Sequence, residues 1–268
     1  MKSRFIAFLT HIGLSSAVAV LAIFIVFFVW YPSPLADAFG VTQLFIMLLS
    51  IDVIIGPLLT FIVYQPLKKS LVFDLSVIAL LQIIALTYGM SSIFQGRPAF
   101  VVFSADRFEV VRFVDINEES RETARAEGNI SANPSWLSPQ WIAAIPSKNI
   151  ERRNEILFSS LQGGADLAQL PELYVPLPEV KNKILSKAKT LHQLKMRHNN
   201  FPEIDAKLQG YTENVKWLPL QTRTKDMIVL IKTGRDKFNG TKDFHKKGTG
   251  MSAAATEWLI NKGIKVMG

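Results

Sequence analysis

The chain contains no cysteine. This absence excludes disulfide bonds, thiolate metal sites and cysteine nucleophiles. Histidine is also scarce, with four residues at positions 11, 192, 198 and 245. His192 and His198 are six residues apart and would lie on different faces of one helix, so they make a poor pair of metal ligands.

Familiar catalytic motifs are absent as well. Neither H-E-x-x-H nor G-x-S-x-G occurs. Residues 234–242, GRDKFNGTK, lack the order G-x-x-x-x-G-K-[ST] of a phosphate-binding loop, because five residues separate Gly234 from Gly240 and Thr241 precedes Lys242. We therefore expect no enzymatic activity, no cofactor and no metal ion.

The positive charge of the chain does not indicate nucleic-acid binding. The formal net charge is +8, and the tail 233–268 supplies +4 of it with seven basic and three acidic residues. The part before the tail is only mildly basic, and it lacks the aromatic signature of a sheet that stacks bases. We expect no nucleic-acid partner and assign no function to the basic tail.

Long apolar runs dominate the first 95 residues. They predict three membrane-spanning helices, since about 20 apolar residues cross a bilayer core. The predicted spans are residues 5–30, 41–64 and 73–94. A cleaved signal peptide is disfavoured, because the first run is too long and ends in Trp30 and Tyr31, an aromatic pair typical of a membrane interface.

Charge predicts the orientation of these spans. Basic residues precede the first span and follow the second: Lys2, Arg4, Lys68 and Lys69. Asp74 lies at the same edge of the third span, and residues 31–40 contain no Lys or Arg. Because basic loops stay on the cytoplasmic side, we expect the N-terminus inside and everything after the third span outside.

Asp52 is an ionisable residue inside the second span. It lies 12 residues from Tyr64, or roughly 18 Å from the inner boundary. An unpaired charge at that depth costs at least about 3 kcal/mol, so Asp52 should be protonated or paired and should face the other helices. Gln82 and Ser16 lie at a similar depth, which predicts a hydrogen-bonded cluster of the three side chains.

Two functional readings of Asp52 stand beside this structural one. Asp52 could receive a membrane helix of a partner protein, or it could belong to a proton or ion path. A path needs a relay of ionisable groups, and His11 and Asp74 provide few. Gly56 and Pro57 predict a kink and close helix packing in the same span.

Residues 97–232 predict an outer α+β domain. Runs 100–104 and 107–114 predict one hairpin, and runs 215–221 and 226–232 a second. Helices are expected at 118–128, in the segment that begins at Ser147 and ends at Gly163, and in the basic segment 179–200. The proline-punctuated segment 171–180 is expected to be extended.

Two surface features of this domain remain open. Residues 133–141 contain two tryptophans, which either pack onto the domain or form a peptide-binding rim. The lysines of the basic helix either form a solvated face or contact an acidic partner or lipid headgroups.

Ordered motifs give the chain a specific resemblance. FVWYP, D-x-x-x-G-P-L-L-T, K-K-S-L-x-F-D-L, A-L-L-Q and G-R-P-A-x-x-V-F-x-x-D-R-F occur in that order. They resemble the type IV pilin accessory proteins of the TfpX/TfpZ family, over residues 4 to about 232. The tail 233–268 departs from that family, as a lineage-specific extension or the product of a shifted reading frame.

The resemblance implies a non-catalytic, multi-pass protein of the bacterial inner membrane with a periplasmic C-terminal domain. Its implied partners are the type IV major pilin and other pilus assembly components, within the lipid bilayer. The positions carried over by the motifs are Asp52, Gly56, Pro57, Lys68, Lys69, Asp74, Gln82, Arg97, Pro98, Asp106 and Arg107.

Pilins wait in the inner membrane with an apolar helix in the bilayer and a head outside. We therefore hypothesise that helices near Asp52 and Gly56 hold the pilin helix while the outer domain contacts the head. The alternatives are a membrane enzyme that modifies pilin or the envelope, and a periplasmic sensor.

Overall fold

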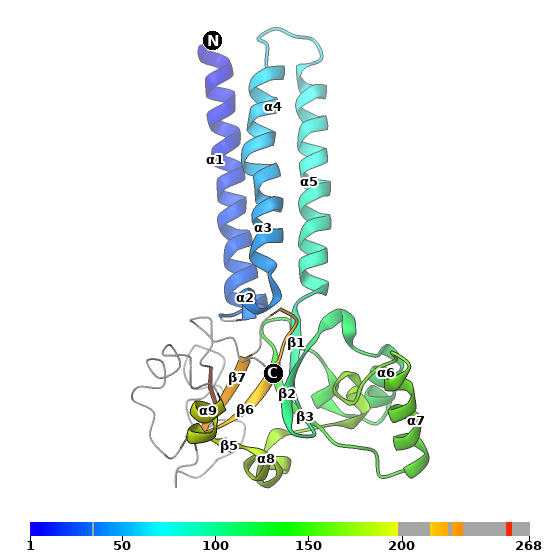
Figure 1. Ribbon diagram of the computed structural model, residues 1–268. Coiled ribbons are helices and arrows are strands. Elements are labelled where there is room, and N and C mark those ends of the chain that lie inside the picture. Colours follow the sequence, from blue (N-terminus) through cyan, green and yellow to red (C-terminus); the bar gives the residue numbers. More distant parts are fainter. Residues whose placement is uncertain (34, 198–214, 225–226, 233–255, 259–268) are drawn as a thin grey trace. The chain divides into compact units, whose positions relative to one another are not determined.

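The computed structural model describes residues 1–33, 35–197, 215–224, 227–232 and 256–258 (Figure 1). The chain divides into two compact units, Met1–Arg97 and Pro98–Gly268. The first is helical and the second contains a mixed β-sheet, which confirms the predicted fold class.

Three helices of the first unit are long and apolar enough to cross a membrane: Lys2–Trp30, Val41–Val63 and Leu71–Gln95. They agree with the predicted spans to within a few residues. The first consists of α1 (Lys2–Phe24) and the π-helical η1 (Ile25–Trp30), and α2 (Leu35–Phe39) follows. The second consists of α3 (Val41–Ser50), the π-helical η2 (Ile51–Ile55) and α4 (Gly56–Val63), and the third is α5 (Leu71–Gln95).

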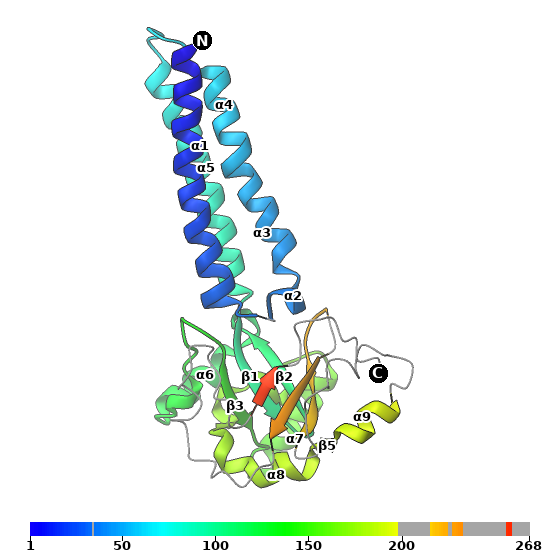
Figure 2. The same ribbon diagram turned by 90° about the vertical axis from the view of Figure 1, so that its left-hand side faces the viewer.

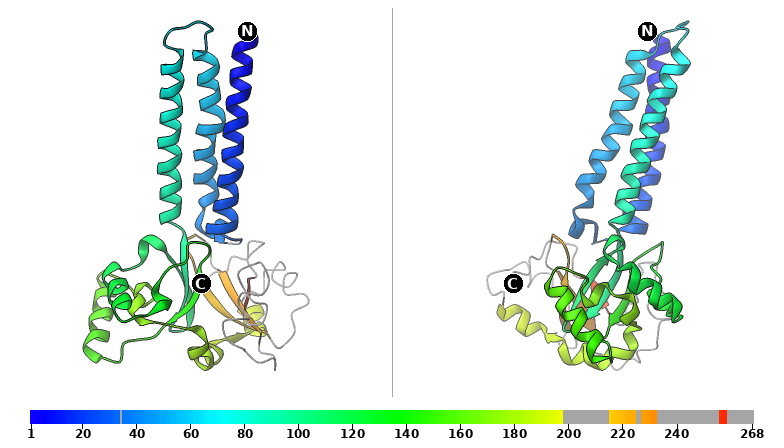
Figure 3. Two further views of the ribbon diagram at one scale, coloured as in Figure 1. Left: turned by 180° about the vertical axis from the view of Figure 1, so that it is seen from behind. Right: turned by 90° about the vertical axis from the view of Figure 1, so that its right-hand side faces the viewer.

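The second span is the middle helix of this unit. Both α1 and α5 pack along it, as Figures 1 and 3 show. Its buried face includes Val41, Phe45 and Leu48, and a Cβ on Gly89 of α5 would overlap the Leu48 side chain. Large apolar residues on the other faces are exposed, as expected for helices surrounded by lipid.

Tyr31 closes one end of the helical unit. Only 3% of Tyr31 is exposed, and its Oη donates to the Ile93 carbonyl at 2.9 Å. That carbonyl lies in the last turn of α5, where helix carbonyls lack backbone donors. Tyr31 is therefore an internal cap of the helical unit, and its position at a membrane interface stays a prediction. Trp30 packs edge-on against Phe94.

The second unit is built on one mixed sheet with the order β4-β3-β1-β2-β6-β7-β8, and β5 pairs with β6. Pairs β1–β3 and β2–β6 are parallel, whereas β1–β2, β3–β4, β5–β6, β6–β7 and β7–β8 are antiparallel. The strands are β1 (Pro98–Ser104), β2 (Arg107–Arg112), β3 (Gln140–Ala144), β4 (Tyr174–Val175), β5 (Lys189–Thr190), β6 (Val215–Gln221), β7 (Met227–Lys232) and β8 (Thr256–Trp258).

Both predicted hairpins are confirmed as β1–β2 and β6–β7. The α-helices of this unit are α6 (Glu118–Ala126), α7 (Ile150–Leu161), α8 (Lys181–Lys187) and α9 (Leu191–Arg197). Short 3₁₀ turns connect them: η3 (Phe113–Asp115), η4 (Ile130–Ala132), η5 (Leu167–Gln169), η6 (Pro171–Leu173) and η7 (Leu177–Val180). Figure 2 shows α8 and α9 joined through β5. Most of the tail 233–268 lies outside the described residues.

Strand β1 forms the centre of the core, because every one of its residues is buried. Phe100 packs edge-on against Tyr174, with ring centroids 5.0 Å apart. Burial raises the pKa of Tyr174, and its Oη donates to the Ala168 carbonyl at 2.6 Å. This bond joins β4 to η5 beneath the sheet.

The periodicity of the basic segment 179–200 predicts one helix, but the structure divides this segment. Ala188 is extended, with φ −68° and ψ 130°, and Lys189 and Thr190 pair with β6. The Thr190 carbonyl accepts a hydrogen bond from Nε1 of buried Trp217 at 3.0 Å. Pairing with a distant strand thus overrides the local helical pattern. Residues 198–200 lie outside the described part of the chain.

Two further predictions need correction. The loop 133–141 ends early, because Gln140 and Trp141 belong to β3. Trp141 packs against Phe108, whereas Trp136 is 71% exposed. Helix α7 is capped by Asn149, whose Oδ1 accepts from two backbone N–H groups, rather than by Ser147.

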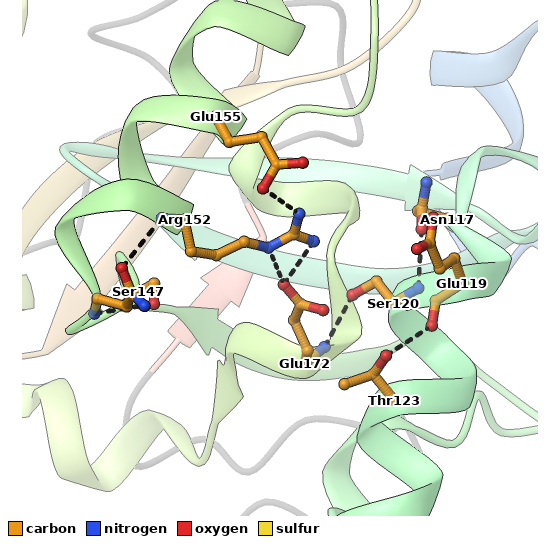
Figure 4. Close-up of polar contacts among 9 residues, drawn as sticks. Asn117, Glu119, Ser120, Thr123, Ser147, Arg152, Glu155 and Glu172 are labelled. Carbon is orange, nitrogen blue, oxygen red and sulfur yellow. Dashed lines mark hydrogen bonds and ion pairs between the residues drawn. The ribbon is translucent and has the colours of Figure 1, made fainter.

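An ion pair fixes α7 to the rest of the unit (Figure 4). Arg152 donates to one oxygen of Glu172 through Nε at 3.0 Å and Nη2 at 2.9 Å, and to Glu155 through Nη1 at 2.9 Å. The backbone N–H of Glu172 donates to Ser120 of α6 at 3.1 Å. The hydrogen bonds that Arg152 donates to Glu155 and Glu172 raise the pKa of Arg152. Helices α6 and α7 are therefore joined through η6.

We predict that Arg152→Ala destabilises the second unit by roughly 1–3 kcal/mol, because it leaves the half-buried Glu172 carboxylate without its guanidinium donor. Chemical unfolding of the full chain in detergent, followed by tryptophan fluorescence, measures this. Arg153→Ala is the matched control, since Arg153 is exposed on the same helix, and should stay within about 0.5 kcal/mol of the parent. Equal effects of both variants would contradict the assignment.

Candidate functional site

Asp52 lies in the middle of the helical unit, in the π-helical η2. The residue is only 6% exposed, and neither carboxylate oxygen has a hydrogen-bond partner among the residues that the structure describes. The prediction that Asp52 faces inward is confirmed. A buried carboxyl group without a hydrogen-bond partner costs free energy.

The backbone around Asp52 has a second gap, which Gln82 fills. The Gly56 N–H bonds the Ile51 carbonyl in π-helical fashion, and Pro57 has no N–H. The Asp52 carbonyl therefore lacks both of its usual backbone donors. The Gln82 side chain of α5 donates to it through Nε2 at 3.1 Å. The hydrogen bond from Gln82 thus goes to the backbone carbonyl of Asp52, and the same amide lies near the carboxyl group.

Gly56 makes room for this bond. A Cβ on Gly56 would overlap the amide of Gln82. Gly56 and Pro57 are both buried. Together they leave the Asp52 carbonyl without a backbone donor and leave space for the Gln82 side chain to reach it. The sequence prediction of close packing at Gly56 is confirmed, and the reason is a polar side chain rather than a neighbouring backbone.

A second polar contact lies on the other side of the second span. His11 of α1 and Thr60 of α4 approach to 2.6 Å between Nδ1 and Oγ1, and Thr60 is buried. Helix α1 packs along both η2 and α4. Sequence reasoning missed Thr60 as a partner, although matching its depth to that of His11 could have found it.

The predicted cluster of Asp52, Gln82 and Ser16 does not form. Ser16 is exposed, whereas Ser15 is buried on the face of α1 that also carries Ala19 and Ala22. Neighbouring helical residues point about 100° apart, so similar depth alone could not choose between the two serines.

The loop between the second and third spans contains an ion pair. Lys68 Nζ lies 2.6 Å from Asp74 Oδ2, and Ser70 donates to the same oxygen. Asp74 lies in the first turn of α5, where a carboxylate also interacts favourably with the helix dipole. Lys69 is exposed.

The four motif residues after the third span divide between the two units. Arg97 stacks on the Phe94 ring at 3.8 Å and donates to the Phe94 carbonyl. Pro98 is the first residue of β1, a position where a strand tolerates proline. Asp106 of the β1–β2 turn pairs with Arg107, the first residue of β2, at 3.3 Å.

Arg107 also donates to Gln221 of β6 at 3.4 Å and so joins the turn to the neighbouring strand. Burial raises the pKa of Glu109, with a further contribution from the charge of Asp166. Arg107 therefore links the β1–β2 hairpin to β6. Among the described residues, no group of three His, Asp or Glu side chains is placed to hold a metal ion.

We predict that Gly56→Ala destabilises the helical unit by roughly 0.6–2 kcal/mol, because the new methyl group displaces the Gln82 amide from the Asp52 carbonyl. Thermal unfolding in detergent measures the change. Gly13→Ala, with open space around it, should be neutral or stabilising. In a Gln82→Ala background the cost of Gly56→Ala should largely vanish. Simple additivity of the two substitutions would refute the coupling.

Comparison with known proteins supplies the family. Residues 1–40 match the model of the family described as "Fimbrial assembly protein FimB". Residues 194–268 match a model described as "Putative cyclase", and most of them lie outside the described residues. No solved structure matches.

Relatives in Dichelobacter nodosus extend over most of the chain. The fimbrial assembly protein of serogroup I is 35% identical over 229 residues, which cover 82% of this chain and 88% of the relative. The serogroup E1 protein is 36% identical with the same coverage, and the protein of serogroups C1 and C2 is 43% identical over 108 residues, 40% of this chain and 82% of the relative. The names describe assembly proteins rather than enzymes. The chain therefore belongs to the family of fimbrial assembly proteins.

Proposed function

We propose that this protein assists fimbrial assembly by binding the type IV major pilin within the inner membrane. It acts without catalysis, as a chaperone or assembly modulator of the TfpX/TfpZ type. The observation that carries the proposal is the buried Asp52 carboxylate, which lacks a hydrogen-bond partner among the described residues of a membrane-spanning unit.

A partner helix with a hydrogen-bond donor would supply the hydrogen bond that the Asp52 carboxylate lacks. Donors to a carboxylate form stronger hydrogen bonds than donors to a neutral group, and no water competes in the bilayer core. Most of the surface of α5 is exposed, so a further helix could pack against it. Gln82 and Gly56 would hold the Asp52 backbone in place while its side chain engages the partner.

The family supports a fimbrial partner. The relatives are named for fimbrial assembly, and a fimbrial subunit that carries an apolar helix would meet the three spans in the same membrane. We extend this role to the present chain and to pilin as the bound subunit. The second unit would then contact the head of the subunit.

For this arrangement we propose that the N-terminus and the loop with Lys68 and Lys69 are cytoplasmic and that the second unit is periplasmic. Single cysteines can test this in a chain that has none. In spheroplasts, an impermeant maleimide should label Glu127→Cys and leave Lys69→Cys unlabelled until the cells are lysed. The reverse labelling would refute the proposed topology.

We predict that Asp52→Asn weakens pilin capture without removing the protein from the membrane. In a strain that lacks the gene, the variant should reach the membrane at parental level. It should co-purify roughly tenfold less pilin or lower still, since a bond to a charged group contributes about 1.5–3 kcal/mol. Sheared surface fimbriae should fall in parallel. The total amount of pilin in the membrane distinguishes two roles. It stays unchanged if the protein is an assembly factor, and it falls in the variant strain if the protein is a chaperone.

The matched control is Asp37→Asn, which removes an exposed carboxylate from the same unit. It should leave both capture and fimbriae at parental level. Normal co-purification of pilin with Asp52→Asn would show that the carboxylate does not bind pilin.

A further inference from the structure

Two segments of the second unit meet at the end of the sheet where β1 begins. Strand β1 starts at Pro98, and Arg112, the last residue of β2, pairs with it. Strand β3 runs parallel to β1 and starts at Gln140, which pairs with Phe100. Figure 1 shows β1, β2 and β3 side by side. The chain that leaves β2 and the chain that enters β3 therefore lie at the same end of the sheet.

Both segments expose large apolar side chains at this end. Val114 follows β2 by two residues and is 55% exposed, and Trp136 and Leu137, just before β3, are 71% and 69% exposed. We call these three residues the apolar edge. Their own segments are fixed in the unit, because Ile116 and Ala132 are buried. The apolar edge is thus a surface feature of an ordered part of the chain.

The place of the apolar edge in the chain indicates what covers it. Helix α5, the third membrane-spanning helix, ends at Gln95, and β1 begins three residues later at Pro98. Three residues of chain reach at most about 11 Å, so this end of the sheet is tethered close to the membrane surface. Trp136 is four residues from Gln140, which keeps it near the same end.

The residue types match the boundary between lipid headgroups and hydrocarbon. Tryptophan is enriched at that boundary, where its ring is buried and its indole N–H stays in a polar environment. A basic residue lies toward the same end of the sheet, because β6 runs parallel to β2 and its last residue, Gln221, pairs with Glu109. The turn that follows β6 carries exposed Arg223, a side chain suited to binding a lipid phosphate.

We propose that Val114, Trp136 and Leu137 insert into the headgroup region of the leaflet at which α5 ends, so that lipid covers the apolar edge. The second unit then has a lipid contact besides its covalent link to α5, and this contact limits its rotation about that link. The proposal depends neither on pilin binding nor on the side of the membrane that the second unit occupies.

Fluorescence quenching by spin-labelled lipid tests the proposal. Because the chain has no cysteine, Leu137→Cys can carry a single fluorophore. The full chain is reconstituted into vesicles of phosphatidylethanolamine and phosphatidylglycerol that contain no other protein. A lipid with a nitroxide near the headgroup end of its acyl chain should quench this fluorophore several-fold more than one on Ile150→Cys. Ile150 is the matched control, since it is 63% exposed and follows the opposite end of β3.

Equal quenching at the two positions would overturn the proposal. So would a fluorophore at position 137 that lipid leaves unquenched and that becomes shielded only when pilin is added, because a protein would then cover the apolar edge.

A substitution beside the fluorophore separates insertion from mere proximity. With the fluorophore at position 137, Trp136→Asp should lower the quenching several-fold, because a carboxylate resists transfer out of water. Trp136→Phe should keep most of the quenching. Since Trp136 is exposed, both variants should unfold at the parental temperature. Unchanged quenching in Trp136→Asp would show that the link to α5 alone brings the segment near lipid, and it would overturn the proposal, as would an equal loss in both variants.

Discussion

One hydrogen bond between two membrane helices is the constraint around which Gly56, Pro57 and Gln82 are arranged. Pro57 has no N–H, and the N–H of Gly56 bonds the Ile51 carbonyl, so the Asp52 carbonyl has no backbone donor. Gln82 supplies the missing hydrogen bond. In water such a carbonyl would be hydrated, but in a bilayer it must be satisfied by protein. Gly56 and Pro57 of the second span and Gln82 of the third therefore act together on the backbone of Asp52.

The spans and hairpins could be predicted from the sequence because each depends on neighbouring residues. Apolar length determines a span, and alternation around the turn at Asp106 determines a hairpin. Features that depend on distant residues escaped prediction. Strand β5 interrupts a regular helical pattern because β6 offers it a partner, and Tyr31 is buried because the last turn of α5 offers a carbonyl.

For the candidate site, sequence depth identified Asp52 and Gln82 but not the atoms that meet. Counting residues along a span gives the depth of a side chain in the membrane. Two side chains make contact only if they also point toward each other around their helix axes. Ser15 and Ser16 differ little in depth and face different directions, and His11 finds Thr60 because both coordinates agree. No pattern in the sequence indicates that Gln82 bonds the backbone rather than the carboxylate.

The π-helical turn at η2 also keeps the second span in phase. Val41 and Thr60 are both buried although 19 positions apart, which at about 100° per residue would place them roughly 100° apart. A π turn accommodates one extra residue, and the remaining 18 positions make about five whole turns. The extra residue acts as a spacer that brings two half-helices onto one face, so a one-residue deletion there would turn Thr60 away from His11 while leaving the hydropathy of the span almost unchanged.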